Sequence, residues 1–174
     1  MTATRVVVGD ITRLDAQGLA VDAIVNAANE GLAAGSGVCG AIFAAAGHRE
    51  LRDACDAIGG CPTGSARATR AFALEAHGVH HVIHAVGPVF SSYPSDEADL
   101  LLASTYRSTL AVAEGLGVER LAIPAISTGV YGFPARRAAA VAAREAIAHE
   151  GALTEILLVA FDADAAGVLS AALG

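Results

Sequence analysis

The chain contains no lysine, and all 11 of its basic residues are arginine. They are outnumbered by 18 aspartate and glutamate residues, which gives a formal net charge of −7. Nucleic-acid-binding proteins usually present a basic face, so this charge balance argues against a nucleic-acid partner. The absence of lysine also excludes a lysine nucleophile or Schiff base. An anionic ligand would have to be held mainly by backbone N–H groups and helix N-termini.

Long apolar runs are also missing, although hydrophobic residues make up 54% of the chain. No uninterrupted stretch approaches the roughly 18 residues that a membrane helix needs. The first ten residues carry one arginine and a short apolar run that soon meets Asp10, which predicts a strand rather than a signal peptide. We therefore expect a cytoplasmic protein without a membrane partner. Arginine in place of lysine, with abundant alanine, is typical of a high-GC bacterial genome.

Cysteine is scarce, because the chain has only three and none of them forms a CxxC pair. In a cytoplasmic protein this pattern favours free thiols over a disulfide framework. Cys55 lies in a helical pattern and is expected in the core, whereas Cys61 precedes Pro62 in a predicted turn. Cys39 lies in a glycine-rich loop, where a thiol is open to a functional role.

Histidines gather in one short segment, at His77, His80, His81 and His84. On a strand, His80 and His84 would share one face while His81 points away. Three metal ligands therefore do not converge without distortion, and we predict no metal and no cofactor. We expect His84 to lie in a buried strand with its ring hydrogen-bonded to the backbone.

Apolar segments alternate between strand and helix patterns along the whole chain, with no repeat or linker between them. We predict one domain over residues 1–174, because this length suits a single domain with a sizeable core. The predicted strands are Arg5–Val8, Ala23–Asn26, Ser65–Arg70, His80–Val86, Arg120–Ala125 and Glu155–Ala160. The predicted helices are Gly40–Ala46, Arg49–Ile58, Asp96–Gly115, Pro134–Glu150 and Ala163–Leu173, with Ser95 as an N-cap and Gly151 as a C-cap. This alternation predicts an α/β fold, a three-layer α/β/α sandwich around a mixed, mostly parallel sheet of about six strands.

Two loops that follow predicted strands share features suited to phosphate binding. After the strand ending at Asn26, the glycine-rich stretch 35–40 leads into a helix; after the strand at 120–125, Ser127-Thr128-Gly129 leads towards Pro134. Such loops present unpaired N–H groups to an anion, and ligands bind beyond the carboxyl ends of strands in these sheets. Two such loops predict a ligand with two phosphates, and Asn26 and Asn29 add donors and acceptors suited to sugar hydroxyls.

The ordered set of motifs resembles a macrodomain, the ADP-ribose-binding module, and most closely its MacroD-type branch. The matching segments keep their order and span nearly the whole chain, so the set is far more specific than any one glycine-rich loop. They are Gly9–Ile11, Val25–Asn29, Gly37–Ile42, Val82–Pro88, Pro124–Gly132 and Phe161-Asp162.

The resemblance implies roles for individual residues in ADP-ribose binding. Asp10 would accept from the adenine amine with Ile11 nearby, and Phe161 would stack on adenine. Asn29 would hydrogen-bond the distal ribose while Asn26 helps to fix the loop. Backbone groups would hold the diphosphate, and the Tyr131 side chain would lie beside the distal ribose. The remaining predicted contacts are Gly37, Val38, Cys39, Gly40, Ser127, Thr128, Gly129 and Val130.

Each of these residues also has a plain structural interpretation. Asp10 could close a strand-end turn, and Asn29 could serve a turn. Phe161 could belong to the core, and Tyr131 could cover it. An esterase triad built on Ser36 or Ser127 is opposed by the lack of a G-x-S-x-G elbow around either serine.

Cys39 is the main departure from the family pattern. The MacroD-type branch carries an aspartate here, which orients or deprotonates a water near the anomeric carbon, and a thiol cannot replace that carboxylate as an acceptor. A helix N-terminus favours the thiolate, which leaves a base or nucleophile role open. Ala34 and Ser36 also interrupt the glycine run of the branch.

The resemblance implies a monomeric hydrolase that binds ADP-ribose and removes ester-linked groups at the distal ribose. The substrates would be ADP-ribosyl-Asp/Glu on partner proteins or O-acetyl-ADP-ribose, with Asn29 and Cys39 as the candidate catalytic residues. The alternative is a non-catalytic reader of ADP-ribosylated proteins. Cys39 favours the reader, whereas Asn29 and Tyr131 favour the hydrolase.

Overall fold

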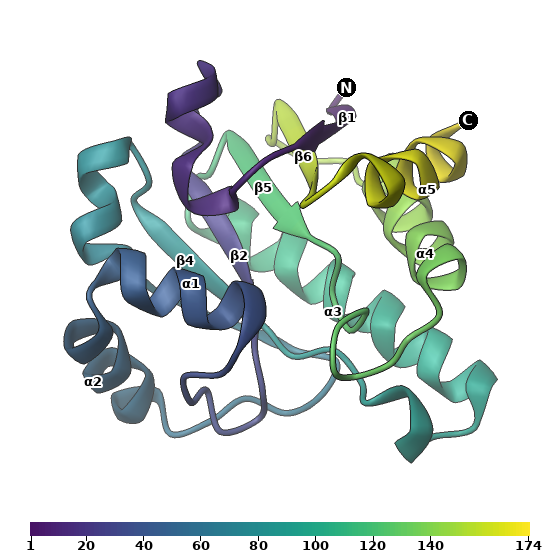
Figure 1. The fold of residues 1–174 in the computed structure, drawn as a ribbon, viewed down its shortest axis with the longest axis horizontal. Coiled ribbons are helices and arrows are strands. Elements are labelled where there is room, and N and C mark those ends of the chain that lie inside the picture. The colour runs from purple at the N-terminus through teal and green to yellow at the C-terminus, as the bar shows by residue number, and fades with distance from the viewer.

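The computed structural model describes all residues from Met1 to Gly174. Strands and α-helices alternate along most of the chain, with short 3₁₀ helices between some of them (Figure 1). The strands are β1 (Ala3–Val8), β2 (Ala23–Ala27), β3 (Ala66–Arg70), β4 (His81–Ala85), β5 (Arg120–Pro124) and β6 (Glu155–Ala160). The helices are α1 (Gly37–Ala46), α2 (His48–Ile58), α3 (Ser95–Gly115), α4 (Ala135–Ala148) and α5 (Ala163–Leu173), with 3₁₀ helices η1 (Ile11–Gln17), η2 (Phe72–His77) and η3 (Phe90–Ser92).

One six-stranded sheet organises the molecule, in the order β1-β6-β5-β2-β4-β3. Every neighbouring pair is parallel except β3 and β4, so the predicted mixed, mostly parallel sheet is confirmed. Buried residues form two apolar clusters, one shared by the sheet with α3, α4 and α5 and the other with α1 and α2. Figure 1 shows these helix groups on opposite sides of the strands. The three layers follow from strands whose side chains alternate between two apolar faces.

The predicted N-cap of α3 is wrong. Helix α3 begins at Ser95 itself, Pro94 holds the N-cap position, and no side chain caps the first turn. Proline suits this boundary because it lacks an N–H group and its φ of −54° is already close to helical. Asp96 and Glu97 still place negative charge in the first turn, where the helix dipole favours it.

The predicted C-cap of α4 is also wrong, because the helix ends at Ala148 and His149 is its C-cap. The chain turns away early because Glu114 of α3 binds the segment that follows. Its carboxylate accepts from His149 Nε2 at 2.8 Å and from the backbone N–H groups of Ala152 and Leu153 at 3.0 Å each. These bonds lower the pKa of Glu114, and the contact with Leu153 has the largest effect.

His84 is fully buried, and its partners are side chains rather than the predicted backbone groups. Nδ1 lies 3.1 Å from Asn26 Nδ2, and Nε2 lies 3.0 Å from Thr69 Oγ1 and 3.7 Å from Cys55 Sγ. Burial lowers the pKa of His84 to about 4, so the ring is neutral at pH 7. Burial also raises the pKa of Cys55 to about 11.

We predict that His84 makes folding stability depend on pH. Its folded pKa of about 4 lies below the unfolded value of 6.5, so the unfolded chain binds the proton more tightly. Stability is therefore complete above pH 6.5 and falls by about 3 kcal/mol as the pH drops towards 4. Urea unfolding of the wild type and of His84→Gln should show this slope only in the wild type. Equal slopes in the two proteins would contradict the prediction.

Candidate functional site

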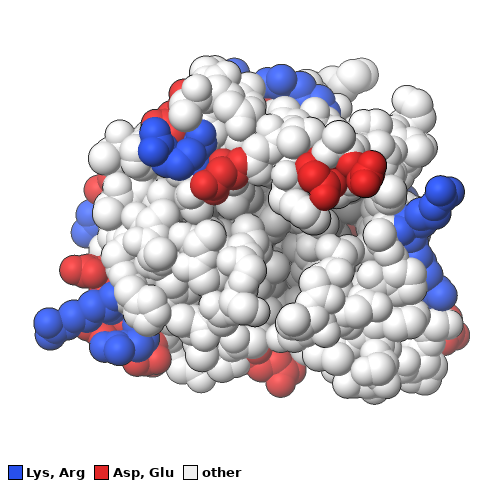
Figure 2. Space-filling view, in the orientation of Figure 1, with Lys and Arg blue, Asp and Glu red and all other residues white.

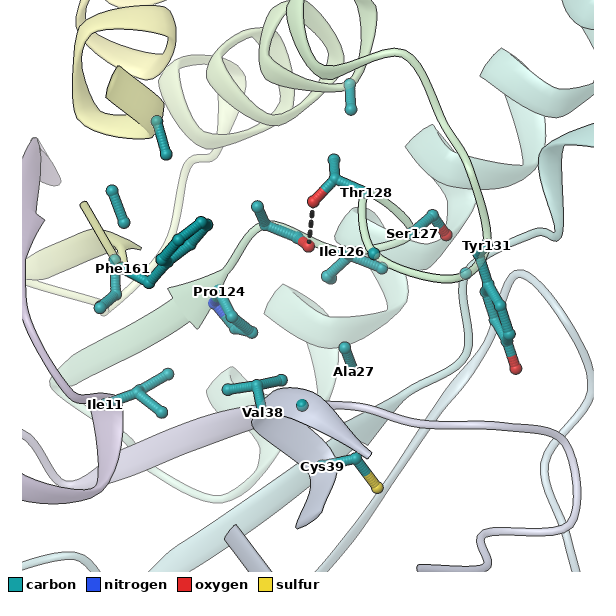
Figure 3. Close-up of a pocket in the computed structure, with 18 of the residues that line it drawn as sticks. Ile11, Ala27, Val38, Cys39, Pro124, Ile126, Ser127, Thr128, Tyr131 and Phe161 are labelled. Carbon is teal, nitrogen blue, oxygen red and sulfur yellow. Dashed lines mark hydrogen bonds between the residues drawn. The ribbon is translucent and has the colours of Figure 1, made fainter. Parts of the chain in front are cut away.

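A single large cleft opens at the carboxyl ends of the central strands. Its volume is about 1020 Å³, which is at the upper end of the range for small-molecule sites. Its walls come from the chain just after β1, from the segment between β2 and α1, from the loop between β5 and α4, and from the β6–α5 junction (Figure 3). Of the predicted ligand residues it is lined by Asp10, Ile11, Asn29, Gly37, Val38, Cys39, Ser127, Thr128, Gly129, Val130, Tyr131 and Phe161.

The loop after β5 exposes a row of unpaired backbone donors. No N–H group from Ser127 to Tyr131 has an acceptor within the protein. The loop is nevertheless held, because Phe133 N donates to Ser127 O at 2.9 Å and Thr128 Oγ1 donates to Ala125 O at 3.0 Å. Ser127 itself has a left-handed φ of 66°. Successive free N–H groups on a fixed loop form an anion-binding nest.

The N-terminus of α1 faces the cleft from the other side. Helix α1 begins at Gly37, earlier than predicted, and its N-cap Ser36 makes no side-chain capping bond. The first-turn N–H groups of Gly37, Val38 and Cys39 therefore have no intrahelical acceptor. Together with the positive end of the helix dipole, they provide a second place for an anion.

No arginine or histidine lines the cleft, and its only lining carboxylate is Asp10. Figure 2 shows uncharged side chains around the central hollow, acidic groups along its upper rim and arginines towards the periphery. Any phosphate bound here would be held by backbone dipoles. This agrees with what the absence of lysine and the acidic balance indicate.

One end of the cleft carries Asp10, Ile11 and Phe161. Asp10 Oδ1 caps η1 by accepting from Thr12 N at 2.9 Å and from Thr12 Oγ1 at 2.7 Å. The turn interpretation of Asp10 therefore holds, and Oδ2 stays free for another donor. Phe161 is 84% exposed, which excludes the core interpretation of this aromatic. In Figure 3 its ring lies across the cleft from Ile11, with Pro124 beside it.

Tyr131 and Cys39 lie in the other part of the cleft (Figure 3). Asn29 also lines the cleft. Asn29 closes its own loop, with Nδ2 donating to Ala33 O at 2.9 Å and Oδ1 accepting from Ala33 N at 3.0 Å. One amide hydrogen and one lone pair of Asn29 remain for a ligand. Burial, with the nearby Glu30 and Cys39, raises the pKa of Tyr131.

The Cys39 thiol is 5% exposed and donates a long hydrogen bond to Ala33 O at 3.8 Å. A side chain at Gly35 would touch it, because an added Cβ there would lie 3.7 Å from Sγ. The thiol thus packs against the loop it belongs to. No carboxylate lines this part of the cleft.

Two of the predicted ligand residues do not line the cleft. Asn26 is 1% exposed and lies against His84 on the side of the sheet covered by α1 and α2. Gly40 lies inside α1, where an added Cβ would come within 2.7 Å of Gly35 O. Gly40 is needed because it lets the loop pass close to the helix. The geometry gives both residues a structural task.

Several lining residues were not predicted as ligand contacts, namely Gly9, Ala27, Ala28, Gly87, Pro124, Val159 and Ala160. Most are small or apolar residues at strand ends, which carry no chemical signature. All of them except Val159 and Ala160 do fall within the macrodomain-like segments, so the motifs contained a signal for them. No three His, Cys, Asp or Glu side chains lie where they could share a metal ion. None of the helices is both long and apolar enough to cross a membrane.

The α/β/α fold thus places two sets of unpaired backbone donors in one cleft. The Macro domain family model matches residues 25–142, and the chain belongs to this family. A macro domain-containing protein of Ralstonia nicotianae is 48% identical over 87% of this chain and 85% of its own length. One from Streptomyces coelicolor is 44% identical over the full length of both.

Solved structures agree with this assignment. A mutant macrodomain of Oceanobacillus iheyensis with ADPR has a TM-score of 0.89 and 35% identity, over 99% of this chain and 92% of its own. The macrodomain of Trypanosoma brucei in complex with ADP-ribose has a TM-score of 0.83 and 34% identity, over 98% of this chain and 69% of its own.

We predict that Gly87 is needed to seat the Ser127 loop. An added Cβ would overlap Ser127 Oγ and come within 2.6 Å of Ile126 Cγ2, both parts of a buried and well-packed wall. Gly87→Ala should lower the free energy of unfolding by about 1–3 kcal/mol, as overpacking does. Gly129→Ala is the matched control, because nothing lies within 4 Å of its added Cβ. Equal stability of both variants in urea would refute this role.

Proposed function

We propose that this macrodomain binds ADP-ribose in the cleft, with the diphosphate held between two sets of backbone donors. The observation that carries the proposal is the row of unpaired N–H groups from Ser127 to Tyr131, which lines the same cleft as the start of α1. Two anion sites in one cleft fit a ligand with two linked phosphates. The solved macrodomains with ADPR and with ADP-ribose, at 34–35% identity, support the same choice.

The proposed orientation places adenine at Phe161 and the distal ribose at Tyr131. Phe161 offers an exposed ring for stacking, and the free Oδ2 of Asp10 can accept from the adenine amine. At the other end, the remaining donor and acceptor of Asn29 suit the ribose hydroxyls. The ligand therefore needs no cationic side chain anywhere along its length.

Calorimetry should detect 1:1 binding of ADP-ribose, tighter than that of AMP. Asp10→Asn should weaken binding at least tenfold, because losing a charged acceptor costs about 1.5–3 kcal/mol, and the amide oxygen can still cap η1. Phe161→Ala should cost about 1–3 kcal/mol of stacking.

Asp164→Asn is the control for charge, because Asp164 is exposed near the rim but does not line the cleft. It should bind as the wild type does. No detectable binding of ADP-ribose at millimolar concentration would overturn the proposal.

We also propose that the cleft hydrolyses an ester at the distal ribose, as in the MacroD-type branch. A water would attack the anomeric or the acyl carbon, and the ester C–O bond would break with release of a carboxylic acid. No carboxylate lines this part of the cleft, so rate enhancement would come from water placement and fixed dipoles rather than from a side-chain base. The free hydrogen-bonding capacity of Asn29 and the presence of Tyr131 in the same cleft favour this activity.

Single-turnover release of ADP-ribose from an ADP-ribosyl-glutamate substrate tests this activity and the part played by Cys39. We expect Cys39→Ala to keep most of the wild-type rate, because the thiol packs against Ala33 and does not act as a base. Cys39→Asp should raise the rate, and Asn29→Ala should lower it more than Cys39→Ala does. Cys61→Ala, which removes a buried thiol outside the cleft, is the matched control.

Normal binding with complete loss of activity in Cys39→Ala would show that the thiol is catalytic. Normal binding with no release by the wild type would leave the alternative function, a reader of ADP-ribosylated proteins.

A further inference from the structure

A chain of hydrogen bonds runs through the interior beneath the loop that carries Asn29. It joins Asn26 of β2, His84 of β4 and Thr69 of β3. Asn26 and His84 are direct partners in the parallel register of β2 and β4. Thr69 Oγ1 donates onward to the carbonyl oxygen of Arg70 at 3.0 Å. These side chains are at most 9% exposed and do not line the cleft.

The geometry gives this chain one consistent set of donors and acceptors, with Cys55 Sγ, 3.7 Å from His84 Nε2, as a further weak acceptor of the same proton. An amide nitrogen can only donate, so Asn26 Nδ2 donates to His84 Nδ1 at 3.1 Å. The proton of the neutral ring must then be on Nε2, which donates to Thr69 Oγ1 at 3.0 Å. The Thr69 hydroxyl can accept this bond because its own hydrogen points to Arg70 O.

Asn26 depends on His84 for its orientation. Its Oδ1 is buried and has no partner, so the bond to His84 is the only one that fixes the amide. A buried unpaired oxygen costs about 1–3 kcal/mol, and an unrestrained amide would turn to relieve it. Asn26 directly precedes Ala27, Ala28 and Asn29, which all line the cleft. Turning the amide would therefore disturb the wall of the cleft.

We propose that His84 is a positioning residue for the ligand site. Its Nε2–H tautomer, fixed by Thr69, orients Asn26 and so holds the segment Ala27–Asn29 against the distal ribose. This role rests on the proposed binding of ADP-ribose. It differs from that of an ordinary core histidine, which would contribute to stability and leave the affinity of the folded protein unchanged.

The tautomer can be read directly by NMR. Long-range ¹H–¹⁵N spectra of the wild type at pH 7 should show that Nε2 of His84 is protonated and that Nδ1 is not. In Thr69→Val, which keeps the shape and removes the acceptor, the His84 signals should shift towards a mixture of tautomers. A wild-type ring protonated at Nδ1 would overturn the proposal, because Asn26 would then present its oxygen.

Binding measurements separate positioning from stability. Thr69→Val should weaken ADP-ribose binding at least about fivefold, the effect of losing roughly one hydrogen bond. Thr69→Ser, which keeps the hydroxyl, should restore the affinity. The matched control is Thr109→Val, because Thr109 is fully buried on α3 and bonds only to Thr105 O. It should lower the melting temperature without changing the affinity.

Wild-type affinity in a folded Thr69→Val protein would refute the role of His84. If the wild type binds no ADP-ribose, the proposed function fails. The backbone amide NMR signals of Ala27, Ala28 and Asn29 then test whether His84 positions this segment. They should shift in Thr69→Val and stay in place in Thr109→Val. Unshifted signals in Thr69→Val would refute the positioning role on their own.

Discussion

The proposed binding of a diphosphate without a cation places one constraint on the whole molecule, because backbone N–H groups bind an anion only where the chain cannot fold back to satisfy them. A flexible lysine side chain can reach a phosphate from many positions, whereas the direction of a backbone N–H group is set by the conformation of its loop. The loop after β5 meets this need through its bond to Phe133, its close packing on Gly87 and the left-handed Ser127. Backbone strain of this kind persists only where the surroundings enforce it.

The need to hold backbone donors in fixed directions also explains why some of the buried side chains beneath the cleft are polar. Apolar packing fixes the sheet, but it does not fix the direction of an amide. The pairs of Asn26 with His84 and of His84 with Thr69 add directional contacts between neighbouring strands. Their cost is a histidine kept neutral by burial and one unpaired oxygen. Rigid support of this sort suits a cleft whose donors cannot adjust to the ligand.

The sequence predicted the sheet well, because its β-branched runs are short and are separated by glycines. It also located the two loops that line the cleft with unpaired backbone donors, since a strand that opens through glycines onto a helix leaves a distinct local pattern. It failed at Ser95, where Pro94 takes the N-cap position, and at Gly151, where Glu114, distant in sequence, binds the segment after α4. It gave Asn26 and Asn29 related roles because both are asparagines, yet Asn26 lies within β2 and is buried, whereas Asn29 follows the strand and lines the cleft. Nothing local could have shown that His84 meets Thr69 and Asn26, since those contacts cross three strands.

The part of the cleft that carries Asp10 and Phe161 is built from segments far apart in the sequence. Asp10 follows β1 and Phe161 follows β6, and these strands pair with each other from Ala3 and Glu155 onward. During synthesis on the ribosome, β1 must therefore wait until the residues up to Ala160 have been made before it finds its neighbour. The loop after β2 and the helices that cover it can form much earlier, because β2 and β4 are close in sequence. The two parts of the cleft thus form at different times, and a chain that stops before β6 would lack both the partner of β1 and the exposed ring of Phe161.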